Sequence, residues 1–207
     1  MILHDYPRSS AAYRVRIALA LKRMPFTSRP VNLLAGEQAS PANRAVNPQG
    51  LVPTLEADGL VLTQSLAIIQ WLDDTHPEPR LIPVDPARRA ACWARALAVA
   101  CDIHPVNNLR ILAALTDRFG ADDAARQDWM RHWMAEGFAA LEAMVGDGPF
   151  LGGDAPDLSD CCLVPQLYNA RRWGLALDPW PRLAAAEAAM LAIPAVAAQA
   201  PEAVMAA

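Results

Sequence analysis

Residues Leu51-Val52-Pro53-Thr54-Leu55 carry the strongest structural signal in the sequence, because a proline stands inside a run that otherwise has the pattern of a strand. Proline cannot donate to a strand ladder, so Pro53 is expected to begin an edge strand or to follow a cis peptide bond. A cis bond would turn the N–H and C=O of Val52 outward, where they can pair with an extended peptide. Shortly downstream, Asp58-Gly59 separates two apolar runs, which is a strong signal for a β-hairpin.

Upstream of this hairpin, strand-like and helix-like patterns alternate. Residues 36–47 are polar and irregular, with about one helical turn expected. Gln64-Ser65 opens an apolar helix that extends through Leu72. The segments expected before the hairpin are a strand over 1–6, a helix over 11–23 and a strand over 26–33. The order β-α-β followed by β-β-α indicates a parallel unit joined to an antiparallel hairpin.

The second half of the chain has a different pattern. Four prolines fall within residues 77–86, which is typical of a stiff linker between domains. Asp157 and Asp160 resemble a capping box with aspartate in place of the usual Ser or Thr cap. The expected helices cover 87–115, 122–145, 158–173 and 181–192. We therefore predict an α/β domain over 1–79, a linker over 80–86 and an all-α domain over 87–207, with fraying after Pro201.

Composition excludes several classes of protein. At 54% hydrophobic and 19% charged residues the chain is too apolar to be disordered, and its net charge of −4 argues against general nucleic-acid binding. The four cysteines show no metal-ligand or CxxC spacing, so buried free thiols and no metal site are expected. Neither a signal peptide nor an apolar run of about 20 residues is present, which favours a cytoplasmic protein without a membrane partner.

Two predicted helix starts could bind anions. Arg8-Ser9-Ser10 lies between the first strand and the first helix, and Gln64-Ser65 opens a later one. The unpaired N–H groups of a helix start stabilise negative charge. A serine there can simply cap the helix, or its hydroxyl can donate to a thiolate and lower the thiol pKa from about 8.5. A strand edge beside two such helix starts is a docking site for a small peptide that carries carboxylates.

These motifs resemble a known family. RSSAAYRVRIAL (8–19), NPQGLVPTL (47–55) and QSLAIIQWLDD (64–74) look like the thioredoxin-like domain of a glutathione transferase. RSS-x-x-x-RVRIAL resembles the zeta class in particular, and CDIHPVNNLRIL (101–112) and DCCLVPQLYNARRWGLALDPWP (160–181) extend the similarity into the helical half. The resemblance implies the glutathione transferase fold, with a thioredoxin-like N-terminal domain and an all-α C-terminal domain, and a homodimer.

The resemblance also implies a glutathione site. Ser9 becomes the best candidate for activating the glutathione sulfur and Ser10 is the alternative, because Ala11 stands where the family often has cysteine. Arg8 would lie beside the sulfur. Residues implied to bind the cofactor glutathione are Ser9, Ser10, Ala11, Arg14, Gln38, Gln49, Val52, Pro53, Gln64, Ser65, His104, Asn108 and Arg110. On residue type alone, a capping or solvated histidine suits His104 better than a ligand-binding one, whereas Arg16 is expected to be structural.

The implied activity is glutathione-dependent cis–trans isomerisation of a maleyl keto diacid. Adding a thiolate to the conjugated alkene makes the bond single, so rotation becomes easy before the thiolate leaves. Two substrate carboxylates suit arginine forks, and the candidates are Arg8, Arg110 and Arg172, with Arg171 as the alternative to Arg172. Of the two substrates, the sequence slightly favours maleylpyruvate over maleylacetoacetate. The other functions that stay open are conjugation or peroxide reduction by a general glutathione transferase, and a non-catalytic regulator of the same fold.

Overall fold

The computed structural model describes residues 1–206, and they form two compact units. The first unit combines Met1–Ile82 with the segment from Leu191 onward, and the second is Pro83–Met190. The division falls inside the proline-rich stretch. The grouping differs from the expectation that everything after residue 86 belongs to the helical domain, because the last segment returns to the α/β unit.

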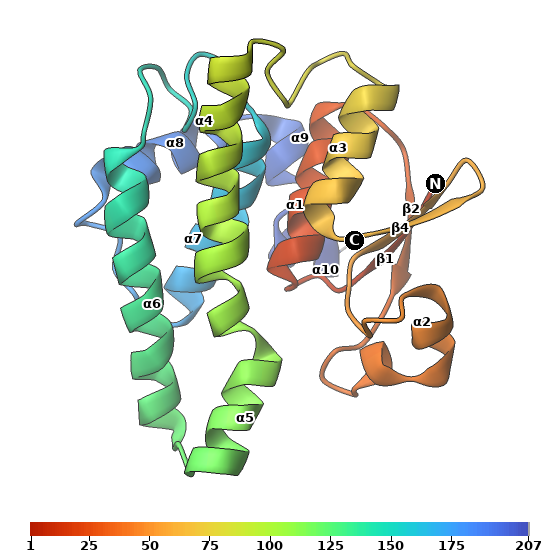
Figure 1. The fold of residues 1–207 in the computed structure, drawn as a ribbon, viewed down its shortest axis with the longest axis vertical. Helices are drawn as coiled ribbons and strands as arrows, with labels where there is room; N and C mark the ends of the chain where they lie inside the picture. Colours follow the sequence, from red (N-terminus) through yellow and green to blue (C-terminus); the bar gives the residue numbers. More distant parts are fainter. Residues whose placement is uncertain (207) are drawn as a thin grey trace. The chain divides into compact units, whose positions relative to one another are not determined.

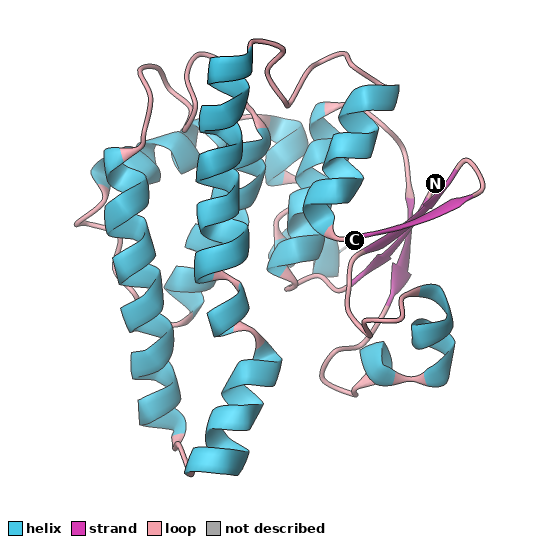
Figure 2. Cartoon of the chain, in the orientation of Figure 1, coloured by secondary structure: helices cyan, strands magenta, loops and turns pink. Residues whose placement is uncertain are grey.

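A four-stranded mixed sheet organises the first unit (Figures 1 and 2). Its strands are β1 (Ile2–Asp5), β2 (Thr27–Pro30), β3 (Thr54–Ala57) and β4 (Leu60–Thr63). The order is β2-β1-β3-β4, with β1 parallel to β2 and antiparallel to β3, and with β3 antiparallel to β4. The predicted hairpin at Asp58-Gly59 is confirmed, and both residues have positive φ, as a tight two-residue turn requires. His4 pairs with Thr54, and Thr54 pairs with Thr63, so these three residues stand side by side.

Helices α1 and α3 pack together on the sheet (Figure 1). The helical segments of this part are α1 (Ser10–Leu21), the 3₁₀ turn η1 (Glu37–Ala39), α2 (Pro41–Val46) and α3 (Ser65–Thr75). Leu3 of β1 and Leu55 of β3 are paired neighbours and fully buried in the core. Arg16 is buried as well, and its guanidinium contacts Asp5 Oδ1 at 2.6 Å and Oδ2 at 2.8 Å. The structural role expected for Arg16 is therefore confirmed. Burial raises the pKa of Asp5, although the Arg16 charge opposes the effect.

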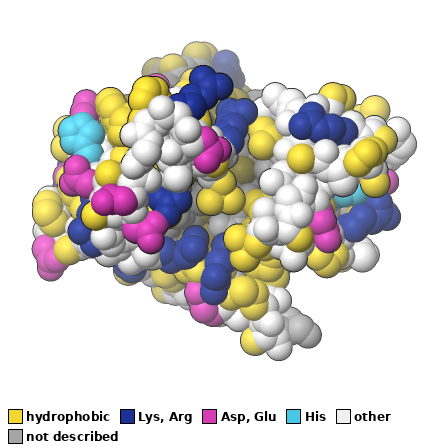
Figure 3. Space-filling view, turned by 90° about the horizontal axis from the view of Figure 1, so that it is seen from below, with side chains coloured by type: hydrophobic (Ala, Val, Ile, Leu, Met, Phe, Trp, Pro, Cys, Tyr) yellow, Lys and Arg dark blue, Asp and Glu magenta, His cyan; other side chains and the backbone are white. Residues whose placement is uncertain are grey.

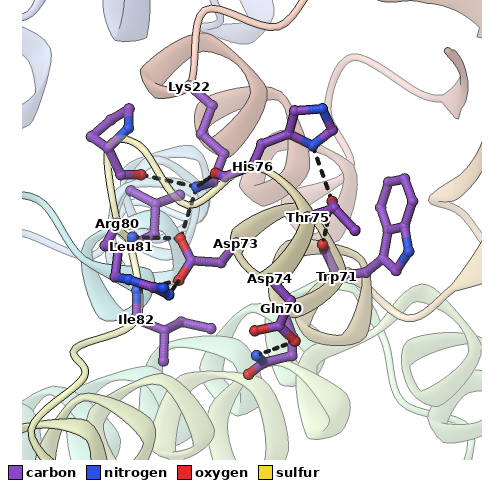
Figure 4. Close-up of polar contacts among 11 residues, drawn as sticks. Lys22, Gln70, Trp71, Asp73, Asp74, Thr75, His76, Arg80, Leu81 and Ile82 are labelled. Carbon is purple, nitrogen blue, oxygen red and sulfur yellow. Dashed lines mark hydrogen bonds and ion pairs between the residues drawn. The ribbon is translucent and has the colours of Figure 1, made fainter.

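A second buried ion pair holds the end of α3 and the chain that follows it (Figure 4). Lys22 Nζ lies 2.7 Å from Asp73 Oδ1, and it also donates to the carbonyls of His76 and Pro79 at 2.8 and 2.9 Å. The Asp73 carboxylate accepts two further hydrogen bonds, from the backbone N–H groups of Leu81 and Ile82. The predicted linker is thus hydrogen-bonded to the first unit up to Ile82.

The second unit is helical (Figure 2). Its elements are α4 (Pro86–Leu97), the π-helical η2 (Ala98–Ile103), the 3₁₀ turn η3 (Pro105–Asn107), α5 (Leu109–Phe119), α6 (Asp123–Ala143), α7 (Leu158–Arg172) and α8 (Pro181–Leu191). The single helix predicted over 87–115 is wrong, because η2 and η3 interrupt it. Pro105 lacks an N–H and cannot continue an α-helix, which gives the break a physical reason.

The capping box predicted at the start of α7 is confirmed. Asp157 accepts from the Ser159 N–H at 2.7 Å, and Asp160 accepts from the N–H groups of Asp157 and Leu151 at 2.9 and 2.8 Å. Gly152 lies against this group, where an added Cβ would be 2.1 Å from Asp157 Oδ2. Burial, together with the neighbouring Asp157 carboxylate, raises the pKa of Asp160 to about 7.

Two expectations about the chain's periphery are wrong. The residues after Pro201 form a helix, α10 (Pro201–Ala206), which follows the short α9 (Pro194–Ala197); α9 packs on α1 within the first unit. Among the free cysteines, Cys92, Cys161 and Cys162 are buried as predicted, whereas Cys101 is exposed on η2. Burial raises the pKa of Cys92 to about 12, so it stays a neutral thiol near pH 7.

Candidate active site

Ser9 begins α1 as its N-cap. Its Oγ accepts a hydrogen bond from the Ala12 N–H at 3.2 Å. A hydroxyl has one donor and two acceptor positions, so the capping bond leaves the O–H proton available. No donation from that proton to another described residue is found. Ser9 can therefore cap the helix and also donate outward to a thiolate. Ser10 and Ala11 are the first two residues of α1 and are partly exposed.

The Val52-Pro53 peptide bond is cis, as the sequence pattern allowed. Within residues 1–206, the N–H and C=O of Val52 form no hydrogen bond. Val52 immediately precedes Pro53 and the start of β3, and it is only partly buried. Its backbone can thus pair with an extended ligand in the way a neighbouring strand would.

The start of α3 lies at the same end of the sheet. Ser65 is buried at the first position of α3, and its Oγ accepts a hydrogen bond from Arg14 Nη1 at 3.3 Å. Arg14 comes from α1 and is itself buried. Gln64 precedes the helix with φ of 68°, and its Nε2 donates to Gln49 Oε1 at 2.8 Å. The structure therefore brings together Arg14 with Ser65, and Gln49 with Gln64.

Gln38 comes close to this group through the backbone. An ideal Cβ on Gly50 would lie 3.0 Å from the Gln38 carbonyl oxygen and 3.2 Å from Arg44 Cζ. Gly50 also has φ of 64°, so both its conformation and its surroundings favour glycine. Sequence reasoning gave Gly50 no role, although the Asn-Pro-Gln-Gly turn pattern could have indicated one. The Gln38 Oε1 is buried and has no hydrogen-bond partner among the described residues. A donor group of a bound ligand could fill this position.

The register of the sheet explains why these segments meet. The chain leaves β1 toward Ser9, approaches β3 through Val52 and leaves β4 toward Gln64. Because His4, Thr54 and Thr63 are paired neighbours, all three segments lie at one end of the sheet. That end offers a hydroxyl donor, an unpaired strand edge and a second helix start.

The remaining predicted site residues lie in the second unit. His104 follows the π-helical segment, and its N–H donates to the Val99 carbonyl at 2.9 Å. Asn108 is the N-cap of α5 and accepts from the Arg110 N–H at 3.2 Å. The Arg110 side chain is exposed.

The structure separates the two adjacent arginines of α7. Arg171 forms a two-pronged ion pair with the buried Glu187, with 2.6 Å between Nη1 and Oε1, and the Arg171 pKa is raised by these bonds. Arg172 is exposed and makes no ion pair within the described chain. In the first unit, Arg8 is likewise exposed, without an ion pair to any described residue. The guanidinium groups of Arg8 and Arg172 are thus open to a carboxylate.

Residues 1–206 contain no helix long and apolar enough to cross a membrane. They also contain no cluster of three or more His, Cys, Asp or Glu side chains that could hold a metal ion.

Comparison with known proteins agrees with this geometry. The family model for the glutathione S-transferase N-terminal domain matches residues 3–80, and the model for the C-terminal domain matches residues 123–188. A maleylacetoacetate isomerase of Pseudomonas aeruginosa is 48% identical over 186 residues, covering 88% of this chain and 87% of that one. A solved structure described as maleyl pyruvate isomerase, a bacterial glutathione S-transferase in Zeta class, has a TM-score of 0.96, 43% identity and 98% coverage of both chains.

This chain belongs to the zeta-class glutathione transferases. The predicted fold, a thioredoxin-like domain followed by an all-α domain, is thereby confirmed. Another solved relative is a maleylacetoacetate isomerase from Anaeromyxobacter dehalogenans 2CP-1, described with bound GSH in the active site. It is 44% identical, with a TM-score of 0.88, and the match covers 98% of this chain and 95% of that one. The glutathione transferase relatives thus carry both substrate names.

Proposed function

We propose that this chain is a glutathione-dependent cis–trans isomerase that converts a maleyl keto diacid to its fumaryl form. The observation that carries the proposal is the meeting of Ser9, Val52 and Gln64-Ser65 at one end of the sheet. The names of the relatives support the same activity, with maleylacetoacetate and maleylpyruvate as the substrates.

The residues present fit glutathione. The unpaired backbone of Val52 suits the cysteinyl unit of an extended tripeptide, and the start of α3 suits its γ-glutamyl carboxylate. The buried Gln38 Oε1 lacks a donor that an ammonium or amide group would supply. From the second unit, we propose that His104, Asn108 and Arg110 also bind glutathione.

Each proposed role follows from ordinary side-chain chemistry. Bound glutathione supplies the thiolate that adds reversibly to the conjugated alkene and so permits rotation. Ser9 donates its hydroxyl proton to the sulfur, which stabilises the thiolate together with the N–H groups of the α1 start. Ser10 is the alternative donor. Arg8, Arg110 and Arg172 bind the substrate carboxylates, and a guanidinium near the carbonyl stabilises the negative charge that develops there.

The experiment is a comparison of Ser9→Ala with Ser40→Ala. Ser40 is a matched control, because it caps α2 through a bond of the same 3.2 Å length. We expect Ser9→Ala to raise the pKa of bound glutathione and to lower isomerisation kcat by about a hundredfold. Ser40→Ala should leave both unchanged. The thiolate is followed by its ultraviolet absorbance, and the isomerisation of maleylpyruvate and of maleylacetoacetate is followed with and without glutathione.

If Ser9→Ala leaves the pKa of bound glutathione and the turnover unchanged, Ser10 is the residue that activates the thiol. Glutathione binding without isomerisation of either substrate, but with conjugation to 1-chloro-2,4-dinitrobenzene, would replace the isomerase with a conjugating transferase. If glutathione does not bind, the chain is a non-catalytic member of the fold. The ratio of kcat/KM for the two keto acids identifies the preferred substrate.

We also propose a homodimer in the cytoplasm. Large hydrophobic side chains are exposed on both units, among them Leu34 at 80% and Phe119 at 79%. Figure 3 shows hydrophobic side chains on the surface between acidic and basic ones. Exposed apolar side chains favour association where they form a contiguous patch. All four cysteines are free thiols, which suits a reducing compartment. Sedimentation equilibrium measures the oligomeric state, and fractionation of the host cells locates the protein.

A further inference from the structure

One face of α6 packs against the interrupted helix of the second unit. Trp129, Trp133 and Gly137 are spaced by four residues and therefore lie along one face of α6. The Trp129 indole Nε1 donates to the Val106 carbonyl at 2.9 Å. The rings of Trp129 and Trp133 meet edge to face, with centroids 5.6 Å apart. Trp129 thus ties α6 directly to η3.

Gly137 makes the second contact, two turns further along. An ideal Cβ at this position would lie 2.3 Å from Ile103 Cγ1 and 2.4 Å from Ile103 Cδ1. Both distances are far inside van der Waals contact, and Ile103 is buried and branched at Cβ, so it cannot simply swing away. Glycine in the interior of a helix is less favourable than alanine. Its presence in the middle of α6 is explained by this close approach.

The two contacts flank the break in the helix. Ile103 ends the π-helical segment η2, and Val106 lies in η3, so His104 and Pro105 stand between the two points held by α6. Asn108 and Arg110 follow directly at the start of α5. A π-helical turn adds one residue to the helical turn and so changes the direction in which the following side chains point.

We infer that Trp129 and Gly137 are positioning residues for ligand binding, because they hold residues 103–106 in the broken-helix conformation that sets the places of His104, Asn108 and Arg110. The inference rests on the proposed function, in which these three residues bind glutathione or the keto acid. Trp129 and Gly137 act through the segment and touch neither ligand. Trp129 therefore contributes more than the packing role that its helical spacing suggests.

The test uses the full chain and steady-state kinetics with glutathione and maleylpyruvate. Trp129→Phe keeps an aromatic ring but removes the indole N–H that donates to Val106, together with part of the ring volume. Gly137→Ala pushes Ile103 away from α6. We expect each to raise KM for both ligands by about five-fold or more, while the pKa of bound glutathione stays at the wild-type value because Ser9 sets it. Adding Ile103→Ala to Gly137→Ala removes the clashing atoms and should return KM toward the wild-type value, even though the melting temperature stays lower.

Trp133→Phe is the matched control. It makes the same substitution one turn away, at an indole whose Nε1 has no hydrogen-bond partner within residues 1–206, so KM should not change. If Trp129→Phe and Gly137→Ala lower the melting temperature but leave KM unchanged, their role is structural and the inference is wrong. Trp129→Phe decides the matter alone if Gly137→Ala does not fold.

Two direct variants separate this inference from the proposed function. Asn108→Ser keeps a capping hydroxyl but removes the amide, and Arg110→Ala removes the guanidinium. If both leave KM unchanged, the ligand-binding role of the segment is wrong. If both raise KM while the two α6 variants do not, only the positioning role is wrong.

Discussion

At the scale of single residues, neighbouring arginines of this chain differ sharply in what surrounds them. Arg14 reaches from α1 to Ser65 at the start of α3, whereas Arg16 is buried against Asp5. A similar division separates Arg171, which is paired with Glu187, from the exposed Arg172. A guanidinium that already holds a carboxylate in a two-pronged pair has few donors left for a substrate. This argues for Arg172 rather than Arg171 as a ligand of the keto acid.

We predict opposite effects for these two arginines. Arg171→Ala leaves the buried Glu187 without its partner and should lower the free energy of unfolding by about 1–2 kcal/mol, less than for a fully buried pair because Arg171 is half exposed. Arg172→Ala should leave stability unchanged and raise KM for the keto acid by about tenfold. Urea denaturation and steady-state kinetics measure the two effects. A substrate defect in Arg171→Ala alone would reverse the assignment.

At the scale of elements, the start of α7 combines a capping box with a pH-sensitive carboxyl group. The folded state raises the pKa of Asp160 to about 7, from about 3.8 in the unfolded chain. Between these two values the folded protein binds more protons than the unfolded one, so the contribution of Asp160 to stability falls as pH rises. The contribution is fully present below about pH 4 and is lost as pH rises through 7.

Asp160→Asn tests this effect. The amide cannot titrate, and it keeps one of the two acceptor oxygens of the box. We predict that the variant is less stable than the wild type at pH 5, and that the difference narrows by pH 8. Urea denaturation at each pH gives the two free energies. A difference that is constant with pH, or that widens toward pH 8, would contradict the raised pKa.

The sequence predicts many of these elements because their signals are local. Pro53, Asp58-Gly59 and the Asp157–Asp160 spacing each indicate one backbone geometry, and the structure has it. The break at residues 98–107 has only Pro105 as a local signal; the π-helical segment before it depends on the approach of Gly137, far along the chain. The sequence does not predict helix α10 either. The helix is too short to show a periodic pattern, and it depends on the packing of the segment from Leu191 onward against the first unit.

Residue types in the candidate site could be predicted from the motifs, but their partners could not. The Arg14–Ser65 and Gln49–Gln64 hydrogen bonds join positions 51 and 15 residues apart, and they depend on how the sheet is assembled. The two-pronged pair of Arg171 with Glu187 likewise required the packing of α7 and α8. Sequence spacing on α7 showed only that Arg171 and Arg172 point in different directions.

At the scale of the whole molecule, the hydrogen bonds of Lys22 and Asp73 extend to Ile82, where the first segment of the first unit ends. Five hydrogen bonds connect these two side chains to each other and to the backbone of residues 76–82 (Figure 4). Both side chains are at most 1% exposed. Breaking a buried ion pair costs about 3–5 kcal/mol. Here the lower end is expected, because Arg80 Nη1, 3.6 Å from Asp73 Oδ2, still compensates part of the carboxylate charge.

We predict that Lys22→Met destabilises the protein by this amount and frees the chain beyond α3. The exposed Arg80 lies within the tethered segment, so trypsin should cut after Arg80 faster in the variant than in the wild type. Mass spectrometry of the fragments identifies the cut. Arg88→Met, which removes an exposed cation from α4, is the control and should leave cleavage after Arg80 unchanged. Equal cleavage rates in all three proteins would mean that other contacts hold the segment.

The burial of Lys22 also limits the reactions that an electrophilic substrate can undergo with this protein. Lys22 is the only lysine among 207 residues, and its side chain has no exposed surface. A maleyl keto acid is an electrophile at its activated alkene and at its carbonyl, and the ε-amine of an exposed lysine would react with both. The other basic side chains are guanidinium groups, which stay protonated and are poor nucleophiles, and the 4 histidines carry no primary amine. If the substrate binds through arginines as proposed, it meets no exposed lysine amine, and the exposed Cys101 is the free thiol that stays open to it.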